Sequence, residues 1–120
     1  MQEVSVIIPN FNGMAYLDGV LAGLECQSVN NFEVILVDNG SSDGSCAFVA
    51  ARYPWVHLIE LPENFGFCKA VNEGIKASRA PYVLLLNNDI EVTENFIEEM
   101  IFAIKRHPKA FSCAARMIQF

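Results

Sequence analysis

The sequence is short of basic residues, because 8 Lys and Arg stand against 14 Asp and Glu, and its net charge is −6. Recognition of nucleic acid depends on Lys and Arg against phosphates, so this balance argues against a nucleic-acid partner. No apolar run approaches the ~20 residues that a membrane helix needs, and no basic segment with an apolar run precedes Val4. We expect a cytoplasmic protein without a transmembrane segment, with peripheral contact at the inner face of the membrane left open.

Metal-binding cysteine patterns are also missing. The four cysteines include no C-x-x-C pair, and neither histidine lies near a cysteine in sequence, which argues against zinc. Cys46 and Cys68 fall on expected buried helix positions. We therefore expect reduced thiols, in agreement with a reducing compartment.

Three well-known functional motifs are absent. The chain has no G-x-x-x-x-G-K-[ST] and no G-x-G-x-x-G, so neither a P-loop nor a dinucleotide fingerprint applies. It has no G-x-S-x-G nucleophile elbow. A receiver-like signalling domain would need an acidic pair after the first strand, and Pro9 to Gly13 contains no acid.

Expected strands and helices alternate along the whole chain. With 52% hydrophobic and 18% charged residues, the 120 residues predict one globular domain, residues 1–120. The periodicity predicts strands over 4–8, 32–37, 56–61, 82–86 and 110–118, and helices over 14–27, 45–53, 67–78 and 93–107. Asn12 and Thr93 are the expected caps of the first and last helices. This order predicts an α/β fold, a mainly parallel sheet with helices on both faces.

The most informative stretch is Leu85-Leu86-Asn87-Asn88-Asp89, in which an apolar run ends in three polar side chains. The apolar residues 83–86 predict a strand buried on both faces. Asp89 then lies just past its carboxyl end, where ligands of open α/β sheets bind. A carboxylate there is suited to a divalent cation that carries a phosphate ligand.

Three further loops are expected at the same edge of the sheet. Phe11 offers an aromatic face for a base, and Asp38 with Asn39 offers hydrogen-bonding groups for a base or ribose. Gly66 opens a helix, so backbone N–H groups can approach a diphosphate there. Each loop also has a purely structural interpretation: Phe11 as a core anchor, and the other loops as ordinary turns and caps. The predicted convergence of all four loops favours a binding site.

Four motifs in order carry a family resemblance. They are residues 4–12 (VSVIIPNFN), 37–43 (VDNGSSD), 64–67 (NFGF) with Asn72 and Gly74, and 86–89 (LNND). Together they resemble the family-two glycosyltransferases, and most closely the rhamnosyltransferase-like branch, in which N-N-D replaces the more usual D-x-D. The resemblance spans essentially all 120 residues.

The resemblance implies a GT-A fold and inverting transfer of a sugar from a nucleoside-diphosphate sugar to an acceptor hydroxyl of a glycan or a lipid-linked acceptor. It implies Mg²⁺ or Mn²⁺ as the cofactor, with Asp89 as the metal ligand. The implied donor-binding residues are Pro9, Phe11, Asp38, Asn39, Asn64, Gly66, Phe67, Asn72, Asn87 and Asn88.

The resemblance also bears on the catalytic base. In this family the base comes from a segment after the strand where this chain ends, so it is expected beyond Phe120. No residue of the chain matches it. We therefore expect a fragment of a longer enzyme, inactive by itself.

Two departures from the family pattern affect these expectations. Many relatives have two acids where this chain has Asp38-Asn39, so dTDP-sugars stand beside UDP-sugars as donors. Asn87 replaces the first acid of D-x-D, so we expect weak metal binding until the nucleotide arrives.

A non-catalytic nucleotide-sugar-binding module and a sugar-nucleotide nucleotidyltransferase remain as alternatives. Exposed apolar surface on a fragment would allow a homo-oligomer.

Overall fold

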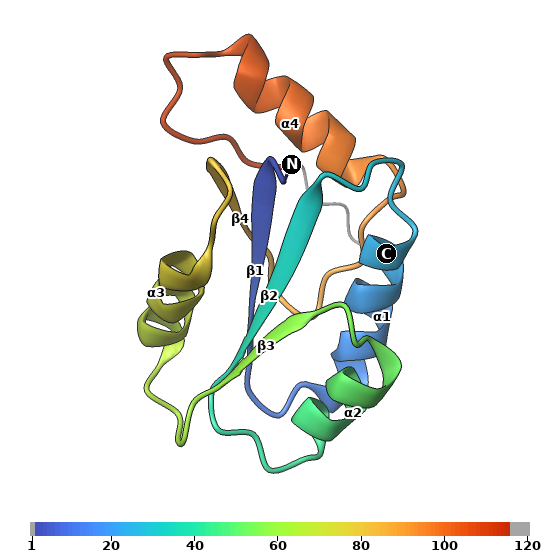
Figure 1. Ribbon diagram of the computed structural model, residues 1–120, viewed down its shortest axis with the longest axis vertical. Coiled ribbons are helices and arrows are strands. Elements are labelled where there is room, and N and C mark those ends of the chain that lie inside the picture. Colours follow the sequence, from blue (N-terminus) through green and yellow to red (C-terminus); the bar gives the residue numbers. More distant parts are fainter. Residues whose placement is uncertain (1, 116–120) are drawn as a thin grey trace.

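The computed structural model describes residues 2–115, which form a parallel sheet with helices on both faces, as the sequence predicts (Figure 1). The elements are β1 (Val4–Asn10), α1 (Met14–Glu25), β2 (Phe32–Asp38), α2 (Ser45–Arg52), β3 (His57–Glu60), α3 (Phe67–Ala77), β4 (Tyr82–Leu85) and α4 (Phe96–Arg106). The strand order is β3-β2-β1-β4, and every pair is parallel. No helix within the described residues is long and apolar enough to cross a bilayer.

The side chains of the central strands β1 and β2 are buried on both faces of the sheet, and this accounts for the layered architecture. Val6 and Ile8 belong to the larger core cluster with α1, α2 and α4, whereas Ile7 belongs to a smaller cluster with Ala70 of α3. Ile7 pairs in register with Ile35 of β2. Figure 1 shows α3 alone on one side of the sheet. Near-continuous apolar runs are what a strand covered on both faces requires.

The α3 helix packs closely on the sheet because of a glycine. A Cβ atom at Gly74 would lie 2.5 Å from Ile7 Cγ2 and 3.2 Å from Val37 Cγ2. Real Cβ atoms do not approach other carbons at 2.5 Å, so the backbone of α3 sits where no larger residue fits. Gly74 therefore sets the distance between α3 and the two central strands.

The expected burial of β4 on both faces is wrong. Leu86 is buried, but Val83 and Leu85 are 43% and 45% exposed. They lie in register with Ser5 and Ile7, on the face that α3 covers over β1 and β2. Among the described residues β4 forms one edge of the sheet, since the expected final strand does not form over residues 110–115.

The end of the chain lies outside the described residues. It includes the remainder of the expected final strand, residues 116–118, and Phe120. The expectation that the catalytic base lies beyond Phe120 therefore stays a prediction.

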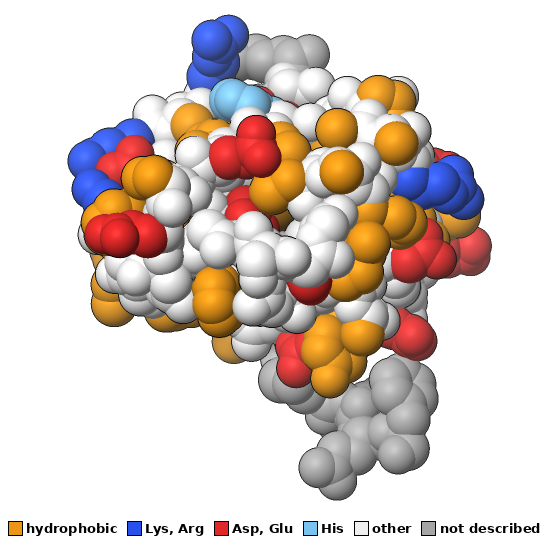
Figure 2. All heavy atoms as spheres, turned by 90° about the horizontal axis from the view of Figure 1, so that it is seen from below, with side chains coloured by type: hydrophobic (Ala, Val, Ile, Leu, Met, Phe, Trp, Pro, Cys, Tyr) orange, Lys and Arg blue, Asp and Glu red, His pale blue; other side chains and the backbone are white. Residues whose placement is uncertain are grey.

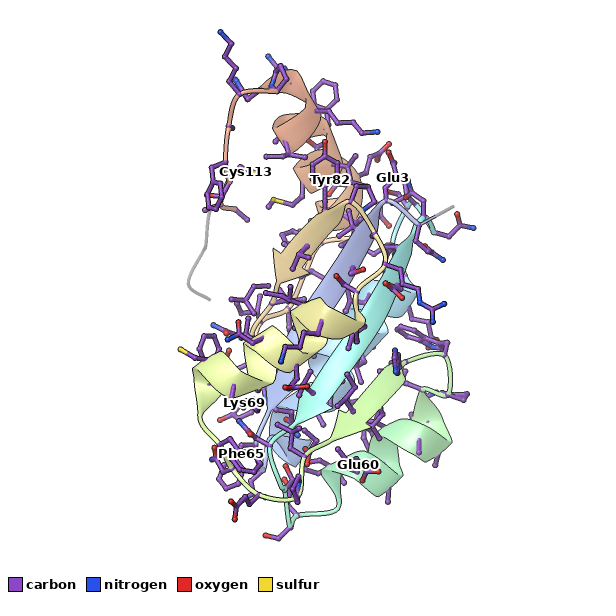
Figure 3. The ribbon with its side chains drawn as sticks, turned by 60° about the vertical axis from the view of Figure 1, so that its left-hand side comes forward. Glu3, Glu60, Phe65, Lys69, Tyr82 and Cys113 are labelled. Atoms are coloured by element: carbon purple, nitrogen blue, oxygen red, sulfur yellow. The ribbon has the colours of Figure 1, made fainter. Side chains whose placement is uncertain are left out.

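An apolar groove of about 360 Å³ lies beside the β4 edge, at the amino end of the strands. Tyr82 and Leu84 of β4, Ile97 and Ile101 of α4, and Phe111 contribute to its walls. Tyr82 and Cys113 mark this end in Figure 3, far from Phe65 and Glu60 at the other end. The groove is therefore separate from the loops in which the sequence predicts a binding site.

Both helix caps that the sequence predicted are wrong, because residues distant in sequence bind the starts of these helices. Gly13, not Asn12, is the N-cap of α1, and the Met14 N–H donates to Asp43 Oδ2 at 3.0 Å. Asn12 instead adopts a left-handed backbone (φ 50°), and its Oδ1 accepts the Ser42 N–H at 2.9 Å. Asp43 also accepts the Ser45 N–H at 3.0 Å, so one carboxylate holds the starts of α1 and α2. Capping rules that consider only neighbouring residues in the sequence do not include such partners.

A residue distant in sequence also binds the start of α4. Asn95, not Thr93, is its N-cap, and Thr93 donates a side-chain hydrogen bond to Asn95 Oδ1 at 3.0 Å. The Ile97 N–H donates to Gln27 Oε1 at 2.8 Å, although Gln27 lies just after α1. A residue 70 positions earlier thus supplies the cap that the sequence assigned to Thr93.

Candidate functional site

The loops after β1, β2, β3 and β4 all lie at the carboxyl edge of the sheet, which is the lower end in Figure 1. Figure 2 shows this face from below: polar side chains and backbone form its middle, hydrophobic side chains and several acidic groups lie around it, and Lys and Arg lie only at its margins. The residue types at this edge are those expected from the sequence. Their positions follow from hydrogen bonds that join the loops.

Asn10, at the end of β1, joins three strands, and sequence reasoning did not single it out. Its side chain is buried, at 2% exposure. Asn10 Nδ2 donates to Asp38 Oδ1 at 2.9 Å, and its Oδ1 accepts from Asn88 Nδ2 at 2.7 Å. Gly13 lies directly against this pair, because a Cβ there would be 2.1 Å from Asn88 Nδ2. The only signal in the sequence was an amide at the end of a buried strand.

Asp38, at the end of β2, uses both carboxylate oxygens within the protein. Oδ2 accepts the Ser41 N–H at 2.8 Å, and Oδ1 accepts the Ser41 hydroxyl at 2.6 Å together with Asn10. This is an Asx-type turn, as the structural interpretation of the loop predicted. The Ser41 hydroxyl in turn accepts the Asn12 N–H at 2.8 Å, so the loops after β1 and β2 form one unit. The role of Asp38 toward a nucleotide stays a prediction.

Asn39 joins this unit to the loop after β3. Its side chain is 5% exposed, its Oδ1 accepts the Phe65 N–H at 3.1 Å, and its Nδ2 donates to the Gly66 carbonyl at 3.0 Å. Asn64 Oδ1 accepts the Gly66 N–H at 2.8 Å. Gly40 completes the contact, because a Cβ there would lie 2.7 Å from Glu63 Cα. The expected loops after β2 and β3 are therefore in direct contact.

The loop after β3 leads directly into the start of α3. Gly66 has φ 91° and ψ 166°, a conformation that is essentially restricted to glycine, and no side chain caps the helix. Phe65 and Phe67 are 46% and 53% exposed, so both rings face solvent at this edge. Asn72 is exposed and lies between the buried positions Ala70 and Gly74, so the helical period places it on the outer side of α3. Asn72 is therefore not brought together with the other predicted site residues.

The residues after β4 are arranged differently from those after β1 and β2. Asn87 and Asp89 are exposed, whereas Asn88 is half-buried by its bond to Asn10. That bond brings the Asp89 turn to the same edge as Phe11, which is 49% exposed. Phe11 is thus not an anchor in the core. Pro9 is half-buried and pairs in register with Val37.

Asp89 is the one predicted metal ligand, and its surroundings fit that prediction in part. Its carboxylate is exposed and has no hydrogen-bond partner within residues 2–115. The same residues contain no group of three or more His, Cys, Asp and Glu that could hold an ion. One carboxylate with neighbouring amide oxygens cannot hold Mg²⁺ or Mn²⁺ tightly alone. It fits a cation whose other ligands are phosphates and water.

Cys46, on α2, lies beside the carboxylates of Asp38 and Glu60. Burial raises the pKa of its thiol, and these two carboxylates raise it further, to about 12. Cys46 is half-buried, but Cys68 is exposed, so the expected burial of Cys68 is wrong. The reason is that Cys68 lies two residues before the buried Ala70, so the helical period places it on the outer side of α3. All four cysteines are free.

We expect Cys46 to be the slowest cysteine toward iodoacetamide at pH 8. With a pKa of about 12, only about one thiol in 10,000 is the reactive thiolate at that pH. Peptide mass spectrometry after timed alkylation measures each site, with exposed Cys26 and Cys68 as internal controls. In urea, Cys46 should react as fast as they do. Equal rates in the folded protein would contradict the inferred environment of Cys46.

The chain is similar in sequence and in fold to known proteins. The family model described as "Glycosyl transferase family 2" matches residues 5–120. Glycosyltransferase GlyG of Streptococcus pneumoniae is 31% identical over 100 residues, a match that covers 81% of this chain and 33% of that protein. The chain thus spans about a third of the length of this relative.

Two solved structures have the same fold. Residues 1–349 of S. aureus TarS, in complex with UDP-GlcNAc, match with a TM-score of 0.81 and 26% identity, over 89% of this chain and 32% of that chain. A mannosyltransferase from Pyrobaculum calidifontis, in complex with GDP-Man and Mn²⁺, matches with a TM-score of 0.79 over 85% of this chain and 32% of that chain. Its 23% identity supports the fold alone.

Proposed function

The chain belongs to glycosyl transferase family 2, and from this premise we propose that it is the donor-binding part of an inverting glycosyltransferase. The proposed donor is a UDP- or dTDP-sugar, and the proposed acceptor is a hydroxyl of a glycan or of a lipid-linked acceptor. The rhamnosyltransferase-like branch remains our proposal for the subgroup. The whole enzyme's reaction is a proposal as well, because the chain spans only about a third of such relatives.

One observation carries the proposal: a continuous set of hydrogen bonds joins the loops after β1, β2, β3 and β4. Asn10 connects Asn88 to Asp38, and Asn39 connects the same edge to Gly66. Four separate turns would not need to be held together if each were only a connection. A crevice at the carboxyl ends of parallel strands is the usual ligand site of such a sheet.

Each loop then has a chemical task toward the donor. The exposed ring of Phe11 stacks on the base, because aromatic faces bind any base without needing a particular hydrogen-bond pattern. The turn built on Asp38 forms the adjoining wall of the base and ribose site. Phe67, the first residue of α3, presents its backbone N–H to the diphosphate, and Gly66, whose own N–H donates to Asn64 Oδ1, lets the backbone approach it closely. Asn64, Asn87 and Asn88 complete the proposed pocket.

We assign the metal to Asp89, with the diphosphate supplying further oxygen ligands. A bound Mg²⁺ or Mn²⁺ supplies Lewis-acid stabilisation of the charge on the diphosphate leaving group. Asp89 contributes a carboxylate that no protein hydrogen bond occupies within residues 2–115. This arrangement also accounts for nucleotide binding by a chain with a net charge of −6. We assign the base that deprotonates the acceptor to no residue of this chain.

Calorimetric titration with UDP, dTDP and GDP tests the proposal, each with Mn²⁺, with Mg²⁺ and with EDTA. We expect UDP or dTDP to bind at least about tenfold more tightly with a divalent cation than with EDTA, because the cation offsets the charge of the diphosphate. Phe11→Ala should weaken binding about tenfold, since stacking on an aromatic ring contributes ~1–3 kcal/mol. Exposed Tyr16→Ala, on α1, serves as the matched aromatic control. Absence of binding by all three nucleotides would overturn the proposal.

A further inference from the structure

We propose that Asn39 is a positioning residue, which shapes the donor site by holding the Phe65–Gly66 peptide, and that this task requires an amide and not a carboxylate. The inference rests on the proposed function and deepens it. It assigns Asn39 an indirect part in donor binding, through the segment from Asn64 to Phe67. Three features of the structure support it.

The first feature is that both ends of the Asn39 amide are engaged by one peptide segment. Oδ1 accepts the Phe65 N–H at 3.1 Å, and Nδ2 donates to the Gly66 carbonyl at 3.0 Å. The Asn39 backbone N–H also donates to the Asn10 carbonyl at 2.8 Å. The side chain is 5% exposed. A nearly buried amide with both of its polar atoms engaged has little capacity left for a ligand.

The second feature is the conformation of the segment that Asn39 holds. Gly66 has φ 91° and ψ 166°, which is costly to maintain unless surrounding contacts enforce it. The Gly66 carbonyl that accepts from Asn39 also accepts the Ala70 N–H at 3.3 Å, the first hydrogen bond of α3. Asn39 therefore fixes the direction in which α3 leaves the loop. The position of the exposed Phe67 ring follows from that direction.

The third feature is that the two loops are too close to rearrange. A Cβ at Gly40 would lie 2.7 Å from Glu63 Cα and 2.8 Å from Glu63 C, so backbone lies against backbone. A side chain that replaces Asn39 must therefore fit into the same small space between the two loops. A change in hydrogen-bond chemistry there cannot be absorbed by a large shift of either loop.

Hydrogen-bond chemistry explains why an amide is required. In Asn39→Asp, an ionised carboxylate would still accept the Phe65 N–H, but its second oxygen would face the Gly66 carbonyl, so two acceptors would oppose each other. Burial and this opposition disfavour the ionised form and raise the pKa of the introduced carboxyl group. When protonated, that group can donate to the Gly66 carbonyl and restore both contacts.

Other charged groups lie on the elements around this position. They are Asp38 on β2, Glu60 on β3 in register with Asp38, Glu63 in the loop after β3, and Lys69 on α3, which pairs with Glu73 at 2.9 Å. The carboxylate of Asp38, the adjacent residue, disfavours a further negative charge, and Lys69 already has an acidic partner. Their combined effect therefore also raises the pKa of a carboxyl group at position 39.

The test compares nucleotide affinity in wild type, Asn39→Asp and Asn39→Ala between pH 5 and pH 8, with UDP and Mn²⁺ as the probe. The ratio of each variant's affinity to that of wild type removes the effect of protonation of the nucleotide itself. We expect N39D to bind about tenfold more weakly than wild type at pH 8 and to approach wild type at pH 5. N39A should be weaker at every pH, with a constant ratio. A direct ligand contact predicts the same recovery, so a measurement without nucleotide is needed to separate the two roles.

Amide hydrogen exchange of Phe65 and Ala70 in the nucleotide-free protein provides a second readout. N39A should speed exchange at Phe65 about tenfold, whereas exchange at Ile7 in the core should not change. If wild type binds no nucleotide, the proposed function fails while this readout still tests Asn39. N39A is also the fallback if melting curves show N39D to be unfolded at pH 8, because N39A buries no charge. Wild-type affinity of N39D at pH 8, or unchanged exchange at Phe65 in N39A, would overturn the inference.

Discussion

Asp89→Asn is expected to remove most of the cation-dependent part of nucleotide affinity, which is a loss on the order of tenfold in Kd for UDP with Mn²⁺. The substitution keeps the size and the oxygen donor of the side chain but removes its charge. Asp89 is the single carboxylate that we assign to the cation, so no neighbouring acid is expected to replace it. With EDTA present, D89N and wild type should bind UDP almost equally.

Glu91→Gln is the matched control for this prediction. Glu91 is an exposed acid two residues further along the same loop, and its carboxylate lies against α1 at Gly19. Its loss changes the net charge by the same amount, so any general effect of charge on binding appears equally in both variants. We expect E91Q to remain within about twofold of wild type, because exposed charges are screened by salt. Retention of cation-dependent binding by D89N, as measured by calorimetry, would remove Asp89 from the metal site.

Gly74→Ala is expected to destabilise the protein by about 2 kcal/mol, although alanine is the better helix former. A Cβ at Gly74 would lie 2.5 Å from Ile7 Cγ2 in the core, so α3 must move away from β1 and β2 or Ile7 must leave its position. That overpacking outweighs the gain of roughly 1 kcal/mol in helix propensity. Urea unfolding followed by circular dichroism measures the difference.

Gly19→Ala provides the opposite expectation in the same protein. Gly19 is exposed in the middle of α1, and a Cβ there would lie 3.7 Å from Glu91 Oε1, which is an ordinary contact. We expect this variant to be more stable than wild type by roughly 0.5–1 kcal/mol. If both variants shift the urea midpoint in the same direction, close packing at Gly74 is not the cause.

The architecture could be predicted because β1 and β2 contain near-continuous apolar runs between amphipathic helices. Such runs require cover on both faces, and that requirement leads to a parallel sheet between helices. The same reasoning failed for β4, because an apolar run does not tell a central strand from an edge strand. Val83 and Leu85 are exposed since α3 covers only the central strands on that face.

The candidate site was predicted at the level of loops and less well at the level of atoms. Parallel strands place their carboxyl ends together, so the expected meeting of Phe11, the Asp38 turn and Asp89 followed from the parallel direction of the strands. Asn10 was missed because its partners lie 28 and 78 residues away in sequence. Only the folded chain shows that Asn39 has both amide atoms engaged by the next loop.

The shared attachment of α1 and α2 to Asp43 has a consequence in acid. Hydrogen bonds from the Ser45 hydroxyl and the Met14 N–H hold the pKa of Asp43 below its ordinary value of 3.8. A lowered pKa in the folded protein means that the ionised carboxylate contributes stability above pH 3.8, and that this contribution is lost as the pH falls through the lowered value. Protonation of this one side chain would therefore release two helix starts together, and acid would loosen the loops after β1 and β2 in a single step.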